Sequence, residues 1–358
     1  METRIVRINY TKENEPDPAS EKAIAEAGRI LKEGGLVAFP TETVYGLGGD
    51  AFNPESSRRI YQAKGRPSDN PLIVHIADIG DLPELSDRIP KEAYLLSDRF
   101  WPGPLTMILP KKDRVPKETT GGLDTVAIRF PSNPAAKALI REGGGFIAAP
   151  SANRSGRPSP TSAKYVIEDL SGRVDVILDG GDCVIGLEST IVDLTSEIPT
   201  VLRPGGVTLE ELREVLGDVE IDRALIKDDS GIAPKAPGMK YRHYAPKGDL
   251  TVVRGEKAAV ERYINGEIEK ARNTPGHHII TAVIASTETA SSYRADIIKN
   301  IGAREDENAI ARNLFRILRE CDDEGAGRIF AESFAGPGLK EAVMNRLLKA
   351  AGHKEITV

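Results

Sequence analysis

The sequence has few of the residues that build covalent or metal-held scaffolds. Of its 358 residues two are cysteines and five are histidines. Two thiols cannot form a disulfide framework or a four-cysteine zinc site, and five histidines leave little room for a histidine-rich metal centre. No apolar run approaches the roughly 18 residues that a membrane-spanning helix requires. These absences exclude a disulfide-stapled domain and favour a soluble protein with no membrane partner.

An excess of positive charge is also absent. The chain has 48 basic and 54 acidic residues, which gives a net charge of −6 and a pI near 5.6. This balance excludes a broadly basic nucleic-acid coat but allows a local cationic pocket. The first residues lack the apolar stretch of a signal peptide, so we expect a cytoplasmic protein.

The length predicts two or three domains, and the clearest break lies at residues 231–248. This stretch has three prolines, four Lys or Arg residues and no acid, and the prolines disfavour regular structure. We interpret it as an extended linker between a domain at 1–230 and a smaller one at 249–358. Residues 251–358 have 16 basic and 16 acidic residues, so the negative charge lies in residues 1–250.

Short apolar runs alternate with amphipathic stretches in both parts, which predicts α/β packing. For residues 1–230 we expect a twisted mixed sheet. Its strands are expected at 36–39, 72–76, 106–109, 125–130, 146–149, 174–178, 190–194 and 200–203, and its helices at 21–32, 54–63, 91–100, 134–141, 162–170 and 209–216. For residues 249–358 we expect a Rossmann-like unit with a parallel sheet of three or four strands. Its strands are expected at 250–253, 279–285 and 328–331, and its helices at 257–271, 291–301, 307–322 and 339–351.

Hydroxyl side chains and isolated cations recur at the ends of the predicted strands of the first domain. Each cluster has an ordinary structural interpretation. Lys64 and Arg66 could cap a helix end or bind phosphates, and His75 could be a satisfied core residue. Arg129, near the end of a buried strand, needs either a structural acid or a substrate anion as its partner.

The sequence shows no Ser/His/Asp arrangement, no paired-acid pattern, no CxxC and no HExxH motif. What recurs is suited to binding and positioning anions rather than to supplying a covalent nucleophile. We therefore predict no catalytic nucleophile and no direct metal site.

A series of motifs in register over roughly residues 20–210 resembles the YrdC family of threonylcarbamoyl-AMP synthases. They include 40–48 (PTETVYGLG), 64–67 (KGRP), 70–75 (NPLIVH), 126–131 (VAIRFP), 151–156 (SANRSG) and 189–193 (STIVD). The linker and the extra C-terminal domain are similar to the longer, two-domain branch of this family.

The resemblance implies an enzyme, a nucleotidyltransferase, that makes threonylcarbamoyl-AMP and pyrophosphate from L-threonine, bicarbonate and ATP. Mg²⁺ would accompany ATP as the cofactor. The product would go to a complex that transfers the threonylcarbamoyl group to adenosine in tRNA, and a weak contact with RNA is compatible with this role.

The resemblance also assigns residues to the two substrates. The L-threonine site would comprise Thr41, His75, Arg129, Ala149 and Ser189. The ATP site would comprise Lys64, Arg66, Asn70, Thr125, Ser151, Ser159, Arg203 and His243. Carbamates decompose readily in water, so the site must exclude solvent. We therefore expect the linker residues Tyr241, Arg242 and Tyr244 to close over the nucleotide as a lid, with a plain tether as the alternative.

Two other functions remain open at this point. A concave basic face could bind double-stranded RNA without catalysis, although the net charge argues against RNA as the main ligand. A carbamoyltransferase or a phosphatase-like enzyme could use the same anion-binding loops without threonine. The sequence predicts that Arg129→Ala abolishes threonine-dependent pyrophosphate release with little change in stability.

Overall fold

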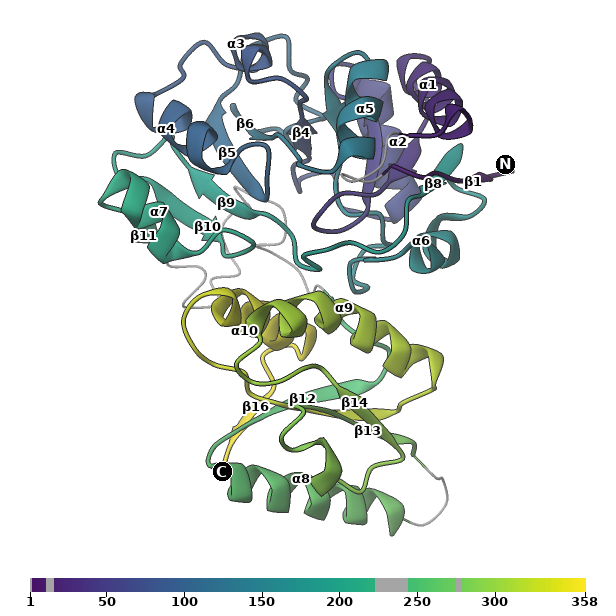
Figure 1. The fold of residues 1–358 in the computed structure, drawn as a ribbon, viewed down its shortest axis with the longest axis vertical. Coiled ribbons are helices and arrows are strands. Elements are labelled where there is room, and N and C mark those ends of the chain that lie inside the picture. The colour runs from purple at the N-terminus through teal and green to yellow at the C-terminus, as the bar shows by residue number, and fades with distance from the viewer. Residues whose placement is uncertain (1, 11–15, 223–243, 275–278) are drawn as a thin grey trace. The chain divides into compact units, whose positions relative to one another are not determined.

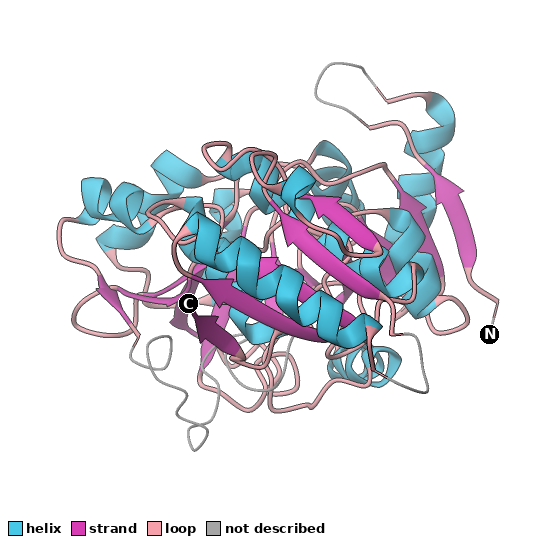
Figure 2. Ribbon diagram, turned by 90° about the horizontal axis from the view of Figure 1, so that it is seen from below, coloured by secondary structure: helices cyan, strands magenta, loops and turns pink. Residues whose placement is uncertain are grey.

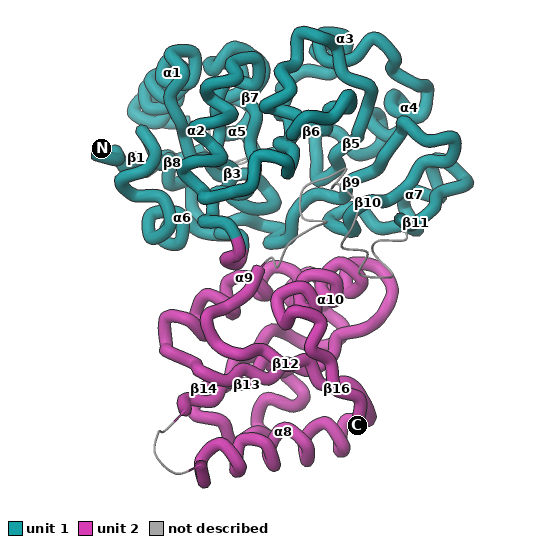
Figure 3. Tube along the Cα trace, turned by 180° about the vertical axis from the view of Figure 1, so that it is seen from behind, with its two compact units in different colours: residues 1–155, 159–241 teal, residues 156–158, 242–358 magenta. Residues whose placement is uncertain are grey.

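The computed structural model describes residues 2–10, 16–222, 244–274 and 279–358. The described chain divides into two compact units (Figure 3). The first comprises residues 1–155 and 159–241, and the second comprises 156–158 and 242–358, outside the gaps just given. Each unit is an α/β structure with its own sheet, as the sequence predicts. Figure 2 shows the helices and strands in different colours.

The N-terminal unit is built on one mixed sheet in the order β1-β8-β2-β3-β7-β4-β6-β5-β9-β10-β11. Five neighbouring pairs are parallel and five are antiparallel. This confirms the mixed sheet. Its strands are β1 (Arg4–Arg7), β2 (Val37–Phe39), β3 (Gly46–Asp50), β4 (Ile73–His75), β5 (Leu105–Pro110), β6 (Thr125–Arg129), β7 (Ile147–Ala148), β8 (Val176–Asp179), β9 (Thr190–Asp193), β10 (Thr200–Arg203) and β11 (Glu220–Ile221).

The helices of this unit begin where the sequence places caps and prolines. In α2, Asn53 accepts a hydrogen bond from the Glu55 N–H, Pro54 opens the helix, and Gly65 ends it in the left-handed conformation (φ 62°). An asparagine cap followed by proline satisfies an orphan donor and presets the first turn. The helices are α1 (Pro18–Lys32), α2 (Pro54–Lys64), η1 (Ile79–Asp81), α3 (Leu82–Leu85), α4 (Lys91–Phe100), α5 (Pro134–Glu142), α6 (Ala163–Leu170) and α7 (Leu209–Leu216).

Side-chain alternation gives the central strands two different faces. On one face, residues such as Met107 and Ile128 join the main core with residues of α4 and α7. On the other face a small apolar cluster contains Ile73, Ile108, Ala127, Ile191 and Leu202. Alternate residues of a strand share a face. The polar side chains of His75, Thr106 and Arg129, each two positions from a member of this cluster, therefore lie on the same face as the cluster, and His75 and Thr106 are the strand neighbours of Arg129. This second face carries the candidate site.

The C-terminal unit has a parallel sheet, as predicted, but with five strands rather than three or four, in the order β14-β13-β15-β12-β16. In Figure 1, α8 lies on one face of this sheet, and α9 and α10 lie on the other. The strands are β12 (Asp249–Arg254), β13 (Thr281–Ala285), β14 (Ile297–Asn300), β15 (Arg328–Glu332) and β16 (Glu355–Thr357), and the helices are α8 (Lys257–Arg272), η3 (Ala290–Ser292), α9 (Glu307–Asp323) and α10 (Leu339–Ala350).

The helix predicted at residues 291–301 is wrong. Residues 297–300 form the edge strand β14, preceded by the short helix η3. Asp296 accepts hydrogen bonds from the Thr281 N–H and hydroxyl, both at 2.8 Å. This pair joins the start of β14 to the start of β13, and the consecutive isoleucines at 297 and 298 favour a strand.

Candidate functional site

The most unusual group of the N-terminal unit is the buried guanidinium of Arg129, at the end of β6. Arg129 is 4% exposed, and its Nη2 lies 2.6 Å from Oε1 of Glu42. Its Nε donates to the Gly103 carbonyl at 3.4 Å. Among the described residues, Nη1 has no hydrogen-bond partner. Arg129 therefore has a structural acid and also keeps donors for a planar anion such as a carboxylate.

His75 lies beside Arg129, because β4 and β6 pair with His75 opposite Arg129. Its Nδ1 lies 3.1 Å from the Ile73 carbonyl oxygen, and its ring meets the Phe39 ring edge-on. Burial, assisted by the positive charge of Arg129, lowers the pKa of His75 to about 3. The imidazole is therefore neutral near pH 7. It can exchange hydrogen bonds there but does not carry positive charge.

A chain of hydroxyl groups runs from β5 to Arg203. Thr106, opposite Arg129 in the β5–β6 pair, shares a hydrogen bond of 2.7 Å with the Ser189 hydroxyl. Arg203 Nε and Nη2 each donate to Ser189, to its carbonyl and to its hydroxyl, at 3.1 Å. The predicted residues Ser189 and Arg203, from the two substrate sets, are thus in direct contact.

Thr41 and Ala149 are buried, and the Thr41 hydroxyl and the Ala149 N–H bond within the protein. The Thr41 hydroxyl donates to the Val44 carbonyl at 2.6 Å and accepts from the Thr43 and Val44 N–H groups. Ala149 N–H donates to the Ile73 carbonyl at 2.8 Å, which joins the end of β7 to β4. In this structure both residues therefore fix the backbone around His75 and Glu42.

Lys64, at the end of α2, binds the loop that follows β7. Its Nζ donates to the carbonyl oxygens of Ser151 and Asn153, both at 2.5 Å, and lies 3.4 Å from Asn153 Oδ1. Ser151 in turn donates to Asn153 Oδ1 at 2.5 Å. The structure thus brings Lys64 and Ser151 together as predicted, with the ammonium holding the loop through its carbonyl groups.

Arg66 and Asn70 also meet. Arg66 Nη2 donates to Asn70 Oδ1 at 2.5 Å and to the Pro71 carbonyl at 3.1 Å. Asn70 is 1% exposed, and its Nδ2 has no hydrogen-bond partner among the described residues. Buried polar groups are rarely left unsatisfied, so this amide N–H group is a candidate donor to a ligand.

Ser159 contacts an acid rather than a cation. Its hydroxyl donates to Glu188 Oε1 at 2.7 Å, and both residues are buried. Thr125, at the start of β6, shares a face with Arg129 but is four residues away from it, roughly 13 Å along an extended strand. Thr125 therefore lies at the opposite end of β6 from Arg129.

Three predicted linker residues, Tyr241, Arg242 and His243, lie outside the described residues. Tyr244 is 4% exposed and belongs to the C-terminal unit, where its ring stacks on Phe315 of α9 with centroids 5.1 Å apart. Arg346 of α10 lies 5.9 Å from the centre of the same ring. Tyr244 is thus anchored in the structure of that unit, which the lid prediction does not anticipate.

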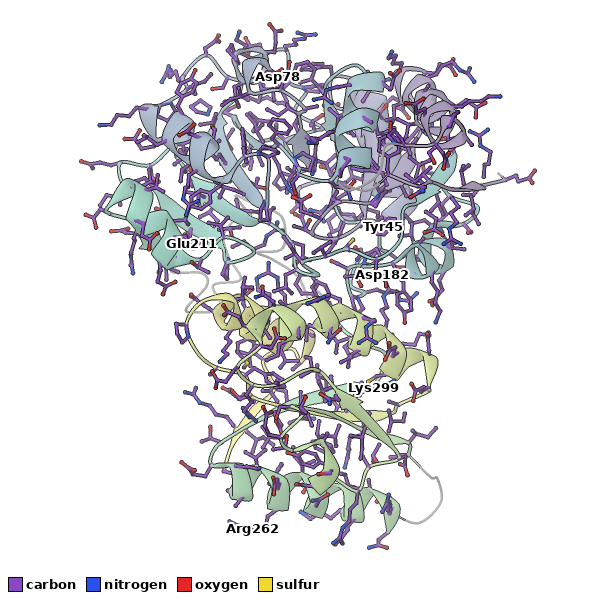
Figure 4. The ribbon with its side chains drawn as sticks, viewed as in Figure 1. Tyr45, Asp78, Asp182, Glu211, Arg262 and Lys299 are labelled. Carbon is purple, nitrogen blue, oxygen red and sulfur yellow. The ribbon has the colours of Figure 1, made fainter. Side chains whose placement is uncertain are left out.

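Sequence reasoning missed Glu42, Thr106, Glu188 and Tyr45. The Tyr45 hydroxyl, in the N-terminal unit (Figure 4), donates to the Gly181 carbonyl at 2.6 Å and accepts from the Gly180 N–H at 3.2 Å. Tyr45 therefore anchors the segment that leads to Ser189. A signal existed for Glu42 and Tyr45, which lie inside the motif at 40–48, but their burial was not evident from the residues alone.

The site therefore combines a carboxylate-binding arginine, a neutral histidine, and loops held by buried cations. Contacts link its parts: Lys64 holds the loop after β7, Ser159 bonds to Glu188, and Ser189 bonds to Arg203. Such equipment defines an enzyme or receptor that positions small anionic ligands on the face of a mixed α/β sheet.

Comparison with known proteins identifies the family within this class to which the chain belongs. Residues 29–205 match the Sua5/YciO/YrdC family, described as "Telomere recombination", and residues 207–352 match the C-terminal domain of threonylcarbamoyl-AMP synthase. A threonylcarbamoyl-AMP synthase of Bacillus subtilis is 47% identical over 94% of this chain and 95% of its own length. One of Pyrococcus abyssi is 50% identical over 94% of this chain and 96% of its own length.

A solved structure of P. abyssi Sua5 in complex with L-threonine superposes with a TM-score of 0.92, at 46% identity, covering 99% of this chain and all of that one. The chain belongs to the Sua5 branch of the threonylcarbamoyl-AMP synthase family. It is thus an enzyme of the nucleotidyltransferase class. Among the described residues, no helix has the length and apolar character to cross a bilayer.

Proposed function

We propose that this enzyme forms threonylcarbamoyl-AMP from L-threonine, bicarbonate and ATP. The ammonium group of zwitterionic L-threonine and bicarbonate first give a carbamate, with loss of water and one proton. A carbamate oxygen then attacks the α-phosphorus of ATP, and the bond to the departing pyrophosphate breaks. The membership in the family and the threonine complex of the P. abyssi relative support this proposal.

The observation that carries the proposal is the geometry of Arg129. Its guanidinium is 4% exposed, yet its Nη1 has no hydrogen-bond partner among the described residues. A buried cationic group with free donors favours a planar anion, and the threonine carboxylate fits it bidentately. Nearby, the neutral His75 and the Ser189 hydroxyl can exchange hydrogen bonds with the rest of the amino acid without adding charge.

The nucleotide is proposed to bind along the loops that Lys64 and Arg66 organise. In this arrangement Asn70 Nδ2 supplies a free donor, Ser151 and Ser159 lie on the loop after β7, and Arg203, at the end of β10, contacts Ser189. The proposal also assigns Thr125 and His243 to the ATP site. Thr125 lies at the end of β6 opposite to Arg129. Catalysis then depends on proximity and on neutralising phosphate charge.

The proposed reaction requires no protein nucleophile. Burial raises the pKa of the Cys183 thiol, so the thiolate is disfavoured. Among the described residues, no hydrogen bond joins a serine or a cysteine to a histidine. We therefore assign the attack on ATP to the substrate carbamate itself.

Magnesium is proposed to enter with ATP, bound to phosphate oxygens and water, as is usual for this hard cation. In the described part of the chain, no group of three or more Asp, Glu, His or Cys side chains is placed to hold a metal ion. When bound, Mg²⁺ would neutralise charge on the triphosphate. The residues of this chain would orient the two substrates.

The test is to incubate the enzyme with ATP, Mg²⁺, L-threonine and ¹³C-bicarbonate. We expect an adenylate whose mass includes threonine and one labelled carbon, with one pyrophosphate per product. Arg129→Met should abolish the product. Arg58→Met, a matched change at an exposed arginine, should not. Pyrophosphate released without labelled adenylate would refute the proposal.

The product is proposed to donate its threonylcarbamoyl group to tRNA through a separate transfer complex. The corresponding test adds that complex and tRNA, and follows the labelled carbon into adenosine. Label that stays in the small-molecule fraction would restrict the proposal to synthesis of the adenylate.

A further inference from the structure

Glu42 is a buried acid in a site that is proposed to bind an amino acid through its carboxylate. The residue is 7% exposed, and its Oε1 pairs with Arg129 Nη2 at 2.6 Å. Its Oε2 is buried and has no hydrogen-bond partner among the described residues. A negative group at this position opposes the binding of an anion, so its presence calls for an explanation.

The backbone around Glu42 fixes this position. Its carbonyl accepts from the Ile185 N–H at 2.8 Å, and the Thr43 carbonyl accepts from the Gly186 N–H at 3.1 Å. On the other side, the Thr41 hydroxyl accepts from the Thr43 and Val44 N–H groups. Because both flanks are bonded, the backbone of Glu42 is held in place beside Arg129, and the buried side chain pairs with the guanidinium.

The charge balance of the pair has a consequence for specificity. Arg129 and Glu42 together are neutral, so a plain carboxylate that binds to Arg129 adds a negative charge that this pair does not compensate. Such a charge is costly away from water. A zwitterionic amino acid is neutral overall and brings its own ammonium group, so it avoids this cost.

We infer that Glu42 is a specificity-determining residue that makes the site favour zwitterionic amino acids over plain carboxylates. The inference rests on the proposed function, because it places the amino-acid carboxylate on Arg129. Glu42 acts here through its charge and through its hold on Arg129. It discriminates by opposing the wrong ligand, a common route to selectivity.

The experiment compares L-threonine with (3R)-3-hydroxybutanoate, which lacks only the amine. Dissociation constants are measured by isothermal titration without ATP. For the unmodified protein we expect 3-hydroxybutanoate to bind at least tenfold more weakly. In Glu42→Gln, whose amide oxygen can still accept from Arg129, this ratio should fall at least fivefold, because 3-hydroxybutanoate binds more tightly. In Glu42→Asp, which keeps the charge, the ratio should stay above ten.

Asp169→Asn is the matched control. Asp169 is 2% exposed and accepts a hydrogen bond from the Arg154 N–H at 3.0 Å. The substitution therefore removes a buried negative charge elsewhere in the N-terminal unit. In this control, the ratio of the dissociation constants for 3-hydroxybutanoate and L-threonine should equal that of the unmodified protein. A ratio unchanged in Glu42→Gln, or one that falls equally in Asp169→Asn, would overturn the inference.

The comparison of L-threonine with 3-hydroxybutanoate on the unmodified protein tests the inference even if Glu42→Gln does not fold. Equal affinity for the two ligands would overturn it without any variant. Absence of L-threonine binding would instead contradict the proposed function, so the two failures are distinguishable.

Discussion

Replacing Arg129 should damage stability as well as activity, which differs from the expectation from the sequence alone. The sequence left open whether the partner of Arg129 is an acid of the protein or a substrate anion. The structure supplies Glu42 at 2.6 Å, with side-chain exposures of 5% and 9% for the pair. Removing one partner of such a buried pair leaves the other as an uncompensated buried charge.

The expected cost follows from that geometry. Arg129→Met should lower the free energy of unfolding of the N-terminal unit by about 3–5 kcal/mol, the range for breaking a buried pair. The double variant Arg129→Met/Glu42→Leu removes both charges and should recover most of this loss. Both variants should lack threonine-dependent pyrophosphate release, since neither has the guanidinium.

The single tryptophan makes the assay specific to one unit. Trp101 is the only tryptophan in the sequence and lies in the N-terminal unit, where its Nε1 donates to the Leu105 carbonyl at 2.8 Å. Its fluorescence during urea unfolding therefore follows that unit. If Arg129→Met unfolds at the same urea concentration as the unmodified protein, or if the double variant is less stable than the single one, the buried-pair reasoning is refuted.

Three further predictions concern residues around the site. The pKa of His75 falls from 6.5 to about 3 on folding, so the unfolded chain binds one more proton between these pH values. Stability should therefore fall as the pH falls below 6.5, by about 2 kcal/mol at pH 5. Urea unfolding followed by Trp101 fluorescence should show this loss and His75→Gln should reduce it; an identical pH dependence in the variant and the unmodified protein would contradict the prediction. Lys64→Met removes the ammonium that holds the Ser151 and Asn153 carbonyl groups and should raise the KM for ATP about tenfold, with an unchanged Kd for L-threonine by titration; an unchanged KM would show that this loop does not need Lys64. Tyr45→Phe leaves the Gly181 carbonyl and the Gly180 N–H without the hydroxyl and should cost about 1–3 kcal/mol in urea unfolding; a stability equal to that of the unmodified protein would mean that water replaces it.

Much of the fold follows from local patterns that the structure keeps. The helix after Asn53 and Pro54 begins and ends where its cap, its proline and Gly65 predict. Strand β3 could not be predicted, because Gly46–Asp50 contains three glycines, which disfavour strands. The structure explains it: a Cβ on Gly48 would come within 2.8 Å of the Ile147 side chain. Only tertiary contacts require small residues there.

In the candidate site, too, local sequence predicts some features and tertiary contacts decide the others. The types of residue at the strand ends predicted anion binding, and Arg129 in a buried strand predicted a partner. The identity of that partner depends on which loops meet across the sheet, as do the contacts of Lys64 with residues 87 and 89 positions away. Neither pairing has a signature within a single segment of sequence.

The most direct test of the account is pyrophosphate release from ATP and Mg²⁺, measured with each of the other two substrates omitted in turn. The account predicts release only when L-threonine and bicarbonate are both present, with one labelled threonylcarbamoyl-AMP per pyrophosphate. Release that continues without L-threonine would contradict the central claim that the site joins an amino acid to a nucleotide.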